Sequence, residues 1–200
     1  DRLILSDETG GIFNGDYILA ALALDMQANG LLRGPVVGSV MSNLGLELLL
    51  AEKGIAFERA AVGDRYVLER MKTTGSNLGG EPSGHILLPH LTRSGDGLIA
   101  ALQILGVMCR TGKTASELLN QFVPVPQKLV NLPDIDKSVL KEASIIQTVA
   151  AVEAELGNNG RVVLRPSGTE PLIRVMVEAV DEPALDKAME KLVTAIESYR

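Results

Sequence analysis

The segment 161–178, RVVLRPSGTEPLIRVMVE, places two apolar-rich runs on either side of a short polar loop. In the second run apolar residues recur at every second position, at Ile173, Val175 and Val177. This is the period of a half-buried strand, and the first run, 161–165, alternates in the same way. We therefore predict a hairpin of two strands joined by a short loop.

The loop of this hairpin brings together Arg165, Ser167, Gly168 and Thr169. Phosphate binds to several convergent N–H and O–H donors, so a guanidinium, two hydroxyls and a glycine-freed backbone favour an anion-binding loop. The same residues are also typical of a solvated turn, because Ser-Gly is common in turns. The loop by itself leaves both interpretations open.

The elements around the hairpin predict a small domain. A strand is predicted at 127–132 and a helix at 138–156, and a helix with one apolar stripe follows at 183–199. This β-α-β-β-α order is typical of a two-layer α+β domain with an antiparallel sheet. Two prolines within 116–126 mark a hinge, and we assign residues 121–200 to this domain.

Upstream of the hinge, predicted strands alternate with predicted helices. The strands are expected at 2–6, 35–41, 55–62 and 85–88, and the helices at 17–29, 43–53, 65–72 and 98–109. Asp16, Asp64 and Asp96 precede three of these helices and are predicted N-caps. The alternation, with near-continuous apolar strands, predicts a mixed α/β/α sheet domain over residues 15–120. The helix at 98–109 is apolar almost all round, so we expect it to be buried on several sides.

Composition narrows the class of protein. The net charge of −6 and the pI near 5.0 argue against nucleic acid or an anionic membrane as the general partner. No run of eighteen apolar residues is present, so no membrane span is predicted. Cys109 is the single cysteine, which excludes an internal disulfide and fits a reducing compartment such as the cytoplasm. It lies in an apolar run, so we expect it to be buried and inert.

A second concentration of polar side chains lies in the glycine-rich segment 79–85, GGEPSGH. Glu81 can accept two hydrogen bonds from vicinal hydroxyls, Ser83 can donate or accept one, and His85 can move a proton near neutral pH. A histidine just before a strand is also a common structural residue, and that alternative stays open. The segment lacks the lysine of a P-loop, so a nucleotide site is not supported.

Several motifs in order resemble one enzyme family. GGEPSGH, SGDGLIAALQ and RPSGTEPLIRVMVE are similar to the sugar-binding and phosphate-binding loops of the α-D-phosphohexomutases. VGSVMSNLGLELLL and VGDRYVLERM most resemble the bacterial branch that acts on glucosamine phosphates. The resemblance covers essentially the whole chain. It implies an isomerase that exchanges hexosamine 6- and 1-phosphates through a bisphosphate, in the supply of UDP-N-acetylglucosamine and peptidoglycan precursors.

The resemblance also implies roles for single residues. His85 matches a position that assists proton transfer, and Arg65 is expected to line the same binding cleft. The implied substrate-binding set is Arg65, Glu81, Ser83, Gly84, His85, Arg165, Ser167, Gly168 and Thr169.

The first two residues, Asp1-Arg2, resemble the end of the family's Mg²⁺ loop, D-G-D-G-D-R. Residues 1–14 would then be the tail of a preceding metal-loop domain, with Asp1 one remaining Mg²⁺ ligand. The resemblance implies that missing N-terminal domains carry the nucleophilic phosphoserine, and that the full-length enzyme uses Mg²⁺ and glucosamine 1,6-bisphosphate. We expect the 200 residues alone to be inactive. A mutase of glucose or mannose phosphates and a non-catalytic sugar-phosphate-binding module remain alternatives.

Overall fold

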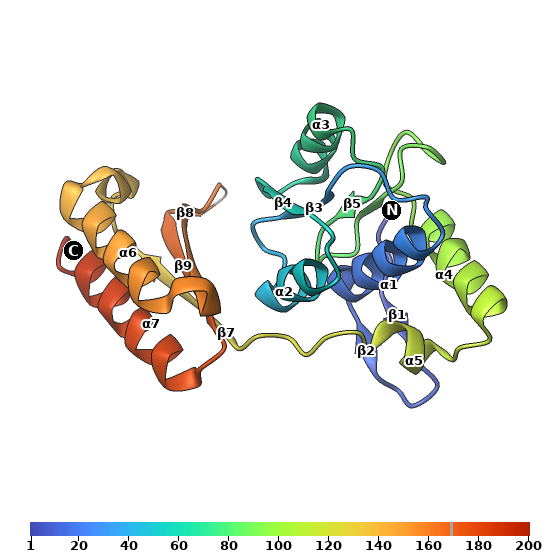
Figure 1. Cartoon of the computed structure of the whole chain (residues 1–200). Helices are drawn as coiled ribbons and strands as arrows, with labels where there is room; N and C mark the ends of the chain where they lie inside the picture. The colour runs from blue at the N-terminus through green and yellow to red at the C-terminus, as the bar shows by residue number, and fades with distance from the viewer. Residues whose placement is uncertain (169) are drawn as a thin grey trace. The chain divides into compact units, whose positions relative to one another are not determined.

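The computed structural model describes residues 1–168 and 170–200, so the predicted phosphate ligand Thr169 lies outside the described residues. The chain divides into two compact units, Asp1–Pro124 and Val125–Arg200 (Figure 1). Among the described residues, no helix combines the length and apolar character needed to cross a membrane.

The first unit is built on a mixed sheet with the strand order β4-β3-β5-β6. These strands are β4 (Phe57–Ala60), β3 (Val36–Ser39), β5 (Gly79–Gly80) and β6 (Ile86–Leu87). The central strand β3 runs parallel to β4 and β5, and β6 is antiparallel to β5. β5 and β6 therefore form a hairpin, and the loop at its tip is the predicted sugar-binding segment.

Helices cover both faces of this sheet. Val36 packs into the core on the side of α1 (Gly15–Ala28), α2 (Leu44–Glu52) and α4 (Gly97–Thr111). Its neighbour Val37 packs on the opposite side, against Val67 and Met71 of α3 (Asp64–Thr74). Successive side chains of a strand point to opposite faces, so this alternation produces three layers (Figure 1). The predicted α/β/α architecture is confirmed.

Residues 1–13 add a small hairpin to the first unit. It pairs β1 (Leu5–Ser6) with β2 (Ile12–Phe13), and Phe13 is buried in the core. The short helix α5 (Ala115–Leu119) packs on α1 and ends the unit.

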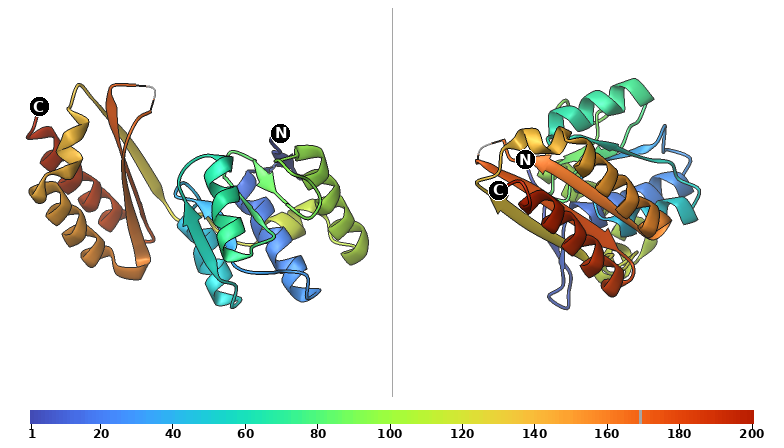
Figure 2. Two further views of the ribbon diagram at one scale, coloured as in Figure 1. Left: turned by 90° about the horizontal axis from the view of Figure 1, so that it is seen from above. Right: turned by 90° about the vertical axis from the view of Figure 1, so that its left-hand side faces the viewer.

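The second unit has two layers. Its antiparallel sheet has the order β7-β9-β8, formed by β7 (Gln127–Pro133), β9 (Leu172–Ala179) and β8 (Gly160–Pro166). Helices α6 (Ala143–Leu156) and α7 (Glu182–Glu197) lie side by side over one face of it (Figures 1 and 2). The helix predicted at 138–156 is two elements, the 3₁₀ helix η1 (Lys137–Lys141) and α6. A second short 3₁₀ helix, η2 (Gly157–Asn159), precedes β8. The predicted α+β architecture is confirmed.

Two predicted helix caps are wrong. Asn14, not Asp16, caps α1, and its side chain accepts a hydrogen bond from the Asp16 N–H at 2.9 Å. The Asp16 carboxylate instead accepts the Asn43 N–H at 2.8 Å. Asp64 is the first residue of α3 and Gly63 occupies the cap. In both cases the carboxylate lies inside the first turn, where it still interacts favourably with the positive end of the helix dipole.

The expectation that α4 is buried on several sides is also wrong. Only one face of the helix packs into the core, through Ala100, Ile104 and Val107. On the other face Leu98 is 72% exposed, and Cys109 is exposed where burial was expected. An almost uniformly apolar sequence conceals which face meets the core, because no polar stripe marks the outer side.

Candidate functional site

The predicted sugar-binding segment is a tight loop between β5 and β6. The Glu81 N–H donates to the His85 carbonyl, and the Gly84 N–H donates to the Glu81 carbonyl, both at 3.0 Å. Gly84 has φ of +95°, and a Cβ there would lie 2.3 Å from the Leu3 carbonyl oxygen. Only glycine fits this position, so Gly84 shapes the loop through its backbone.

The Glu81 carboxylate is held in place from one side. Its side chain is buried, and Oε1 accepts the Gly63 N–H at 2.9 Å. Oε2 lies 3.5 Å from His85 Nδ1. A carboxylate has about four acceptor positions, so Glu81 keeps capacity for ligand hydroxyls after these contacts.

His85 connects the loop to the start of the chain. Its Nε2 lies 2.9 Å from Asp1 Oδ2, and its Nδ1 lies 3.5 Å from Ser83 Oγ. Arg2 Nε also lies 3.4 Å from the same Nε2, which could accept from it only without a proton. The shorter contact to Asp1 favours an Nε2–H that donates to Asp1, which leaves Nδ1 facing Ser83 and Glu81. The structure thus brings Asp1, Glu81, Ser83 and His85 together.

Glu81, Ser83 and His85 line a cavity of about 290 Å³ in the first unit. The volume is at the lower end of the range for small-molecule pockets. Besides Glu81, Ser83 and His85, its lining residues are Arg2, Ser39, Met41, Val62, Gly63, Asp64 and Pro82.

Arg59 positions one wall of this cavity and was missed at the sequence level. Its Nη1 donates to the carbonyls of Ser39 and Ser42, at 3.2 and 2.6 Å, and its Nη2 pairs with Glu47 at 2.8 Å. The guanidinium therefore holds the backbone around Met41, which lines the cavity. The signal in the sequence is only a charged residue within a predicted buried strand.

Arg65, predicted to line the cleft, lies elsewhere in this structure. Its side chain is 82% exposed and pairs with Glu69 one turn along α3, at 3.1 Å. It is not among the residues that line the described cavity.

The predicted phosphate-binding loop connects β8 to β9 in the second unit. The Ser167 N–H donates to the Leu172 carbonyl at 2.9 Å, and Ser167 Oγ accepts the Glu170 N–H at 3.3 Å. Ser167 is buried, but its hydroxyl still has its own hydrogen to donate. A Cβ on Gly168 would meet nothing within 4 Å, so the backbone at Gly168 faces open space that a ligand can enter.

Two arginines give this hairpin a positive end. Arg165 and Arg174 are paired residues of β8 and β9, and Glu170 neutralises only Arg174, at 2.8 Å from its Nη2. Burial, and then repulsion from Arg174, lowers the pKa of Arg165 from its usual value. An arginine side chain stays protonated in proteins, so Arg165 is a charge that an anion would stabilise.

Lys137 supports the same loop and was also missed. Its Nζ donates to the Ser167 carbonyl at 2.6 Å from the 3₁₀ helix η1. No spacing rule connects residues so far apart in sequence, so only the folded structure reveals this contact.

Asp1, the predicted remnant of a Mg²⁺ site, does not form a metal site with the described residues. No group of three or more His, Cys, Asp or Glu among them could hold a metal ion. The Asp1 carboxylate contacts His85, and Mg²⁺ requires several oxygen ligands in octahedral geometry. The residues present therefore do not fit Mg²⁺ by themselves.

Family models match both units. Residues 14–125 match the model described as phosphoglucomutase/phosphomannomutase, alpha/beta/alpha domain III, and residues 118–195 match the C-terminal domain of the same family.

Curated relatives and solved structures agree with the family match. The phosphoglucosamine mutase of Ruegeria pomeroyi is 50% identical over 98% of this chain, and that of Rhizobium meliloti is 46% identical over 100%. The chain spans 44% and 45% of these relatives. A crystal structure of Aspergillus fumigatus N-acetylphosphoglucosamine mutase with GlcNAc-6P and magnesium matches 98% of this chain and 46% of its own, with a TM-score of 0.75 and 17% identity.

Proposed function

The chain belongs to the phosphoglucomutase/phosphomannomutase family, and we propose that it is the ligand-binding part of a phosphoglucosamine mutase. Such an enzyme interconverts glucosamine 6-phosphate and glucosamine 1-phosphate, for UDP-N-acetylglucosamine and peptidoglycan precursors in the cytoplasm. The observation that carries the proposal is the identity of 50% and 46% to mutases of this name over nearly the whole chain.

The loop of the first unit recognises the sugar. Glu81 Oε1 is occupied by the Gly63 N–H, so Oε2 accepts hydrogen bonds from ring hydroxyls. Ser83 donates or accepts a further bond, and Gly84 keeps the loop tight. His85 is anchored to Asp1 through Nε2, so it exchanges a proton with a ligand hydroxyl at Nδ1. Fixing the ring in this way serves orientation rather than bond breaking.

The loop of the second unit recognises the phosphate group. Arg165 offers paired N–H donors to two phosphate oxygens, and such charge-assisted pairs are among the stronger hydrogen bonds in proteins. The Ser167 hydroxyl and the Gly168 backbone add donors of fixed direction, and Thr169 completes the proposed set. Arg65 remains a predicted contact for the longer protein.

Mg²⁺ and glucosamine 1,6-bisphosphate are proposed for the longer protein. The Aspergillus fumigatus enzyme was crystallised with magnesium and a hexosamine phosphate. In these 200 residues Asp1 is the single candidate ligand, and no catalytic step is assigned to the metal here. The proposed missing partner is the N-terminal part of the same polypeptide, with residues 1–14 as the end of its last domain.

Binding and turnover of the 200-residue chain test this proposal separately. We expect calorimetry to detect binding of glucosamine 6-phosphate, and Glu81→Gln to weaken that binding while Glu52→Gln leaves it unchanged. Glu52 is a suitable control because its side chain is 70% exposed on α2 and does not line the cavity. We expect no mutase turnover with glucosamine 1,6-bisphosphate, because the phosphoserine is assigned to residues outside this chain. Turnover by the pure chain, or an affinity that Glu81→Gln leaves unchanged, would contradict the assignment.

Glucose or mannose phosphates are the alternative substrates, because the matching family models bear those names. Comparing kcat/KM of the longer polypeptide on the 6-phosphates of glucosamine, glucose and mannose decides between them. A clear preference for glucosamine 6-phosphate supports the proposal. An upstream reading frame without a serine loop would instead favour a non-catalytic binding module.

A further inference from the structure

Two adjoining cavities lie at the other end of the β5–β6 hairpin from the sugar loop. Asn77 precedes β5 and His90 follows β6, so both lie at the open end of the hairpin. The cavities have volumes of about 350 and 550 Å³ and share Arg33, Asn77 and His90. We call the combined space the Arg33 groove. It shares no lining residue with the cavity around Glu81.

The backbone at Arg33 is held rigidly by the buried side chain of Asn77. Asn77 Oδ1 accepts the Arg33 N–H at 2.8 Å, and its Nδ2 donates to the Leu31 carbonyl at 2.9 Å. The Asn77 N–H donates in turn to the Arg33 carbonyl at 3.2 Å. Gly34, at φ of +64°, lets the loop pass close to the backbone of Ser76. Arg33 thus projects from a loop whose backbone is already ordered, so ligand binding does not have to order this loop.

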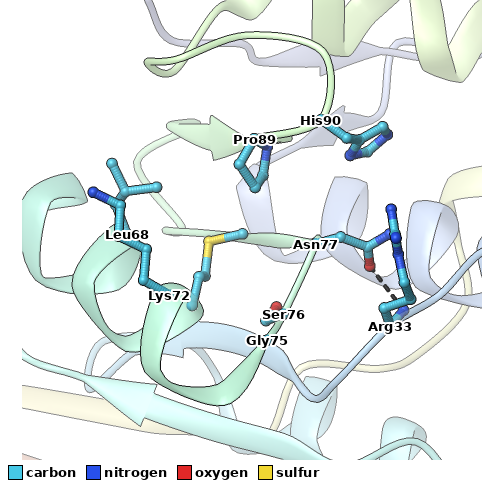
Figure 3. A pocket seen from close by; sticks show the side chains of 9 residues that line it. Arg33, Leu68, Lys72, Gly75, Ser76, Asn77, Pro89 and His90 are labelled. Carbon is cyan, nitrogen blue, oxygen red and sulfur yellow. Dashed lines mark hydrogen bonds between the residues drawn. The ribbon is translucent and has the colours of Figure 1, made fainter.

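The smaller cavity is positively charged in an acidic protein. Arg33 and His90 lie on one side of it, and Leu68 and Lys72 lie opposite (Figure 3). Its described lining includes no Asp or Glu, and none of the three basic side chains has an ion-pair partner among the described residues. With a net charge of −6 for the chain, a cavity lined by Arg33 and Lys72 and by no acidic residue favours an anionic ligand.

The larger cavity adds an apolar wall. Leu22, Leu31, Leu88 and Val107 line it from α1, the following loop, the end of β6 and α4. Its one acidic residue, Asp25, is paired with Arg110 at 2.8 Å and is therefore neutralised. A volume of about 550 Å³ with apolar walls and a few polar groups is typical of a small-molecule site.

We propose that the Arg33 groove binds a small organic anion, with its phosphate or carboxylate at Arg33 and His90 and its apolar body in the larger cavity, which both residues line. Arg33 supplies a planar fork that matches either oxyanion, and the His90 ring supplies an N–H donor. Lys72 lies on the opposite side of the smaller cavity and adds positive charge there (Figure 3). The site is additional to the sugar and phosphate loops of the proposed mutase and does not depend on that function.

Titration calorimetry with phenyl phosphate tests the site. The parent for the test is the Arg165→Ala chain, so that the phosphate loop of the second unit contributes little. We expect saturable binding at millimolar or lower concentration, and at least a tenfold loss of affinity in Arg33→Gln. This variant keeps the backbone bonds to Asn77, so its fold should persist. Arg93→Gln is the matched control, because Arg93 is an exposed arginine of the same unit outside both cavities.

Related probes separate the parts of the proposal. Benzoate in place of phenyl phosphate tells which oxyanion the groove prefers, and binding of either one supports the site. Benzyl alcohol should not bind, because it lacks the charge. Equal affinity for inorganic phosphate would overturn the role of the apolar cavity. Absence of saturable binding, or an unchanged affinity in Arg33→Gln, would overturn the site itself. Each of these results leaves the test of the mutase proposal untouched, because Glu81 takes no part in them.

Discussion

At the scale of single residues, the charge of Arg165 is unfavourable for the folded unit but suited to binding a phosphate. Burial and the neighbouring Arg174 both disfavour its charge, yet it has no carboxylate partner among the described residues. A bound phosphate would stabilise the charge of this guanidinium. The favourable interaction that compensates its burial therefore forms only in the complex. This is the physical reason to place the phosphate contact at Arg165 rather than at Arg174, which already pairs with Glu170.

Arg165→Ala should therefore weaken binding of glucosamine 6-phosphate without unfolding the second unit. A hydrogen bond to a charged group contributes about 1.5–3 kcal/mol, which corresponds to roughly ten- to more than hundredfold in affinity. Calorimetry on the 200-residue chain measures the effect, and KM in the longer polypeptide checks it. Arg70→Ala, which removes an exposed arginine of α3, is the control. An Arg165→Ala chain with full affinity would refute the assignment.

Lys137→Met tests whether positioning of the loop matters as much as direct contact. Lys137 bonds to the Ser167 carbonyl at 2.6 Å, so its loss frees the turn that presents Ser167 and Gly168. We expect about a tenfold weaker affinity for glucosamine 6-phosphate, with recovery in Lys137→Arg, which can donate the same bond. Lys141→Met, in the same 3₁₀ helix but without a described bond to this loop, should change nothing. If Lys137→Met lowers the melting temperature but leaves the affinity for glucosamine 6-phosphate unchanged, Lys137 has a structural role only.

The sequence predicts the role of a residue best when the residues that act together lie close along the chain. Glu81, Ser83 and His85 lie within five positions, and the structure brings them to one cavity. Arg59 and Lys137 act on backbone carbonyls at a distance along the chain, and no periodicity or spacing marks such contacts. The predicted burial of Cys109 is wrong for a different reason, because apolar neighbours in sequence do not tell which side of a helix is covered.

At the scale of elements, the hairpin β1–β2 is fastened to α5 by one carboxylate. Glu8 Oε1 accepts the Ser116 hydroxyl at 2.5 Å, and Oε2 accepts the Ser116 N–H at 3.2 Å. The bond from the Ser116 hydroxyl, followed by one from the backbone of Glu8 itself and one from the Ser116 N–H, lowers the pKa of Glu8 to about 2. A depressed carboxyl pKa means that the ionised group is favoured in the folded state.

This contact gives stability a defined pH dependence. The contribution of Glu8 should be complete above the ordinary carboxyl pKa near 4.5, decline as the pH falls, and be lost as the pH passes through about 2. We therefore expect the melting temperatures of the parent and Glu8→Gln to differ at pH 7 and to converge toward pH 2. Ser116→Ala should show the same convergence, and the double variant should add little. A difference that persists at pH 2 would assign the effect to packing instead.

Strand order explains a pattern that alternation alone does not. Ile173, Val175 and Val177 are buried under the helices as predicted, but Met176 and Glu178 are buried too. β9 is the central strand, with β7 on one side and β8 on the other, and Glu178 pairs with Arg161 of β8 at 2.5 Å. The sequence predicts both strands of the hairpin and a strand at 127–132. It does not predict that β9 lies between the other two strands.

At the scale of the whole molecule, two separate cores account for the two units. One surrounds α1 and both faces of the mixed sheet, and the other fills the space between β9, α6 and α7. The change from β-α alternation to a hairpin-containing order predicts this architecture from sequence. The contacts of residues 1–13 with the first unit, such as the Leu3 N–H to the Gly84 carbonyl at 3.0 Å, require the folded chain to be seen.

Because the second core is complete within residues 125–200, this unit should fold when expressed alone. A domain of this size buries enough apolar surface to be marginally stable. Ile173 is fully buried at the centre of the sheet, so Ile173→Val should cost about 0.5–1.5 kcal/mol and Ile173→Ala about 2–5 kcal/mol. Each kcal/mol lowers the Tm of a domain this small by about 4–8 °C.

Circular dichroism melting of residues 125–200 measures both effects. Leu129→Ala is the matched control, because Leu129 lies on β7 with 44% of its surface exposed and should shift the Tm little. A cooperative transition that moves with Ile173 but not with Leu129 locates the stabilising core between β9 and the two helices. A chain 125–200 without a cooperative transition would contradict an independent second unit.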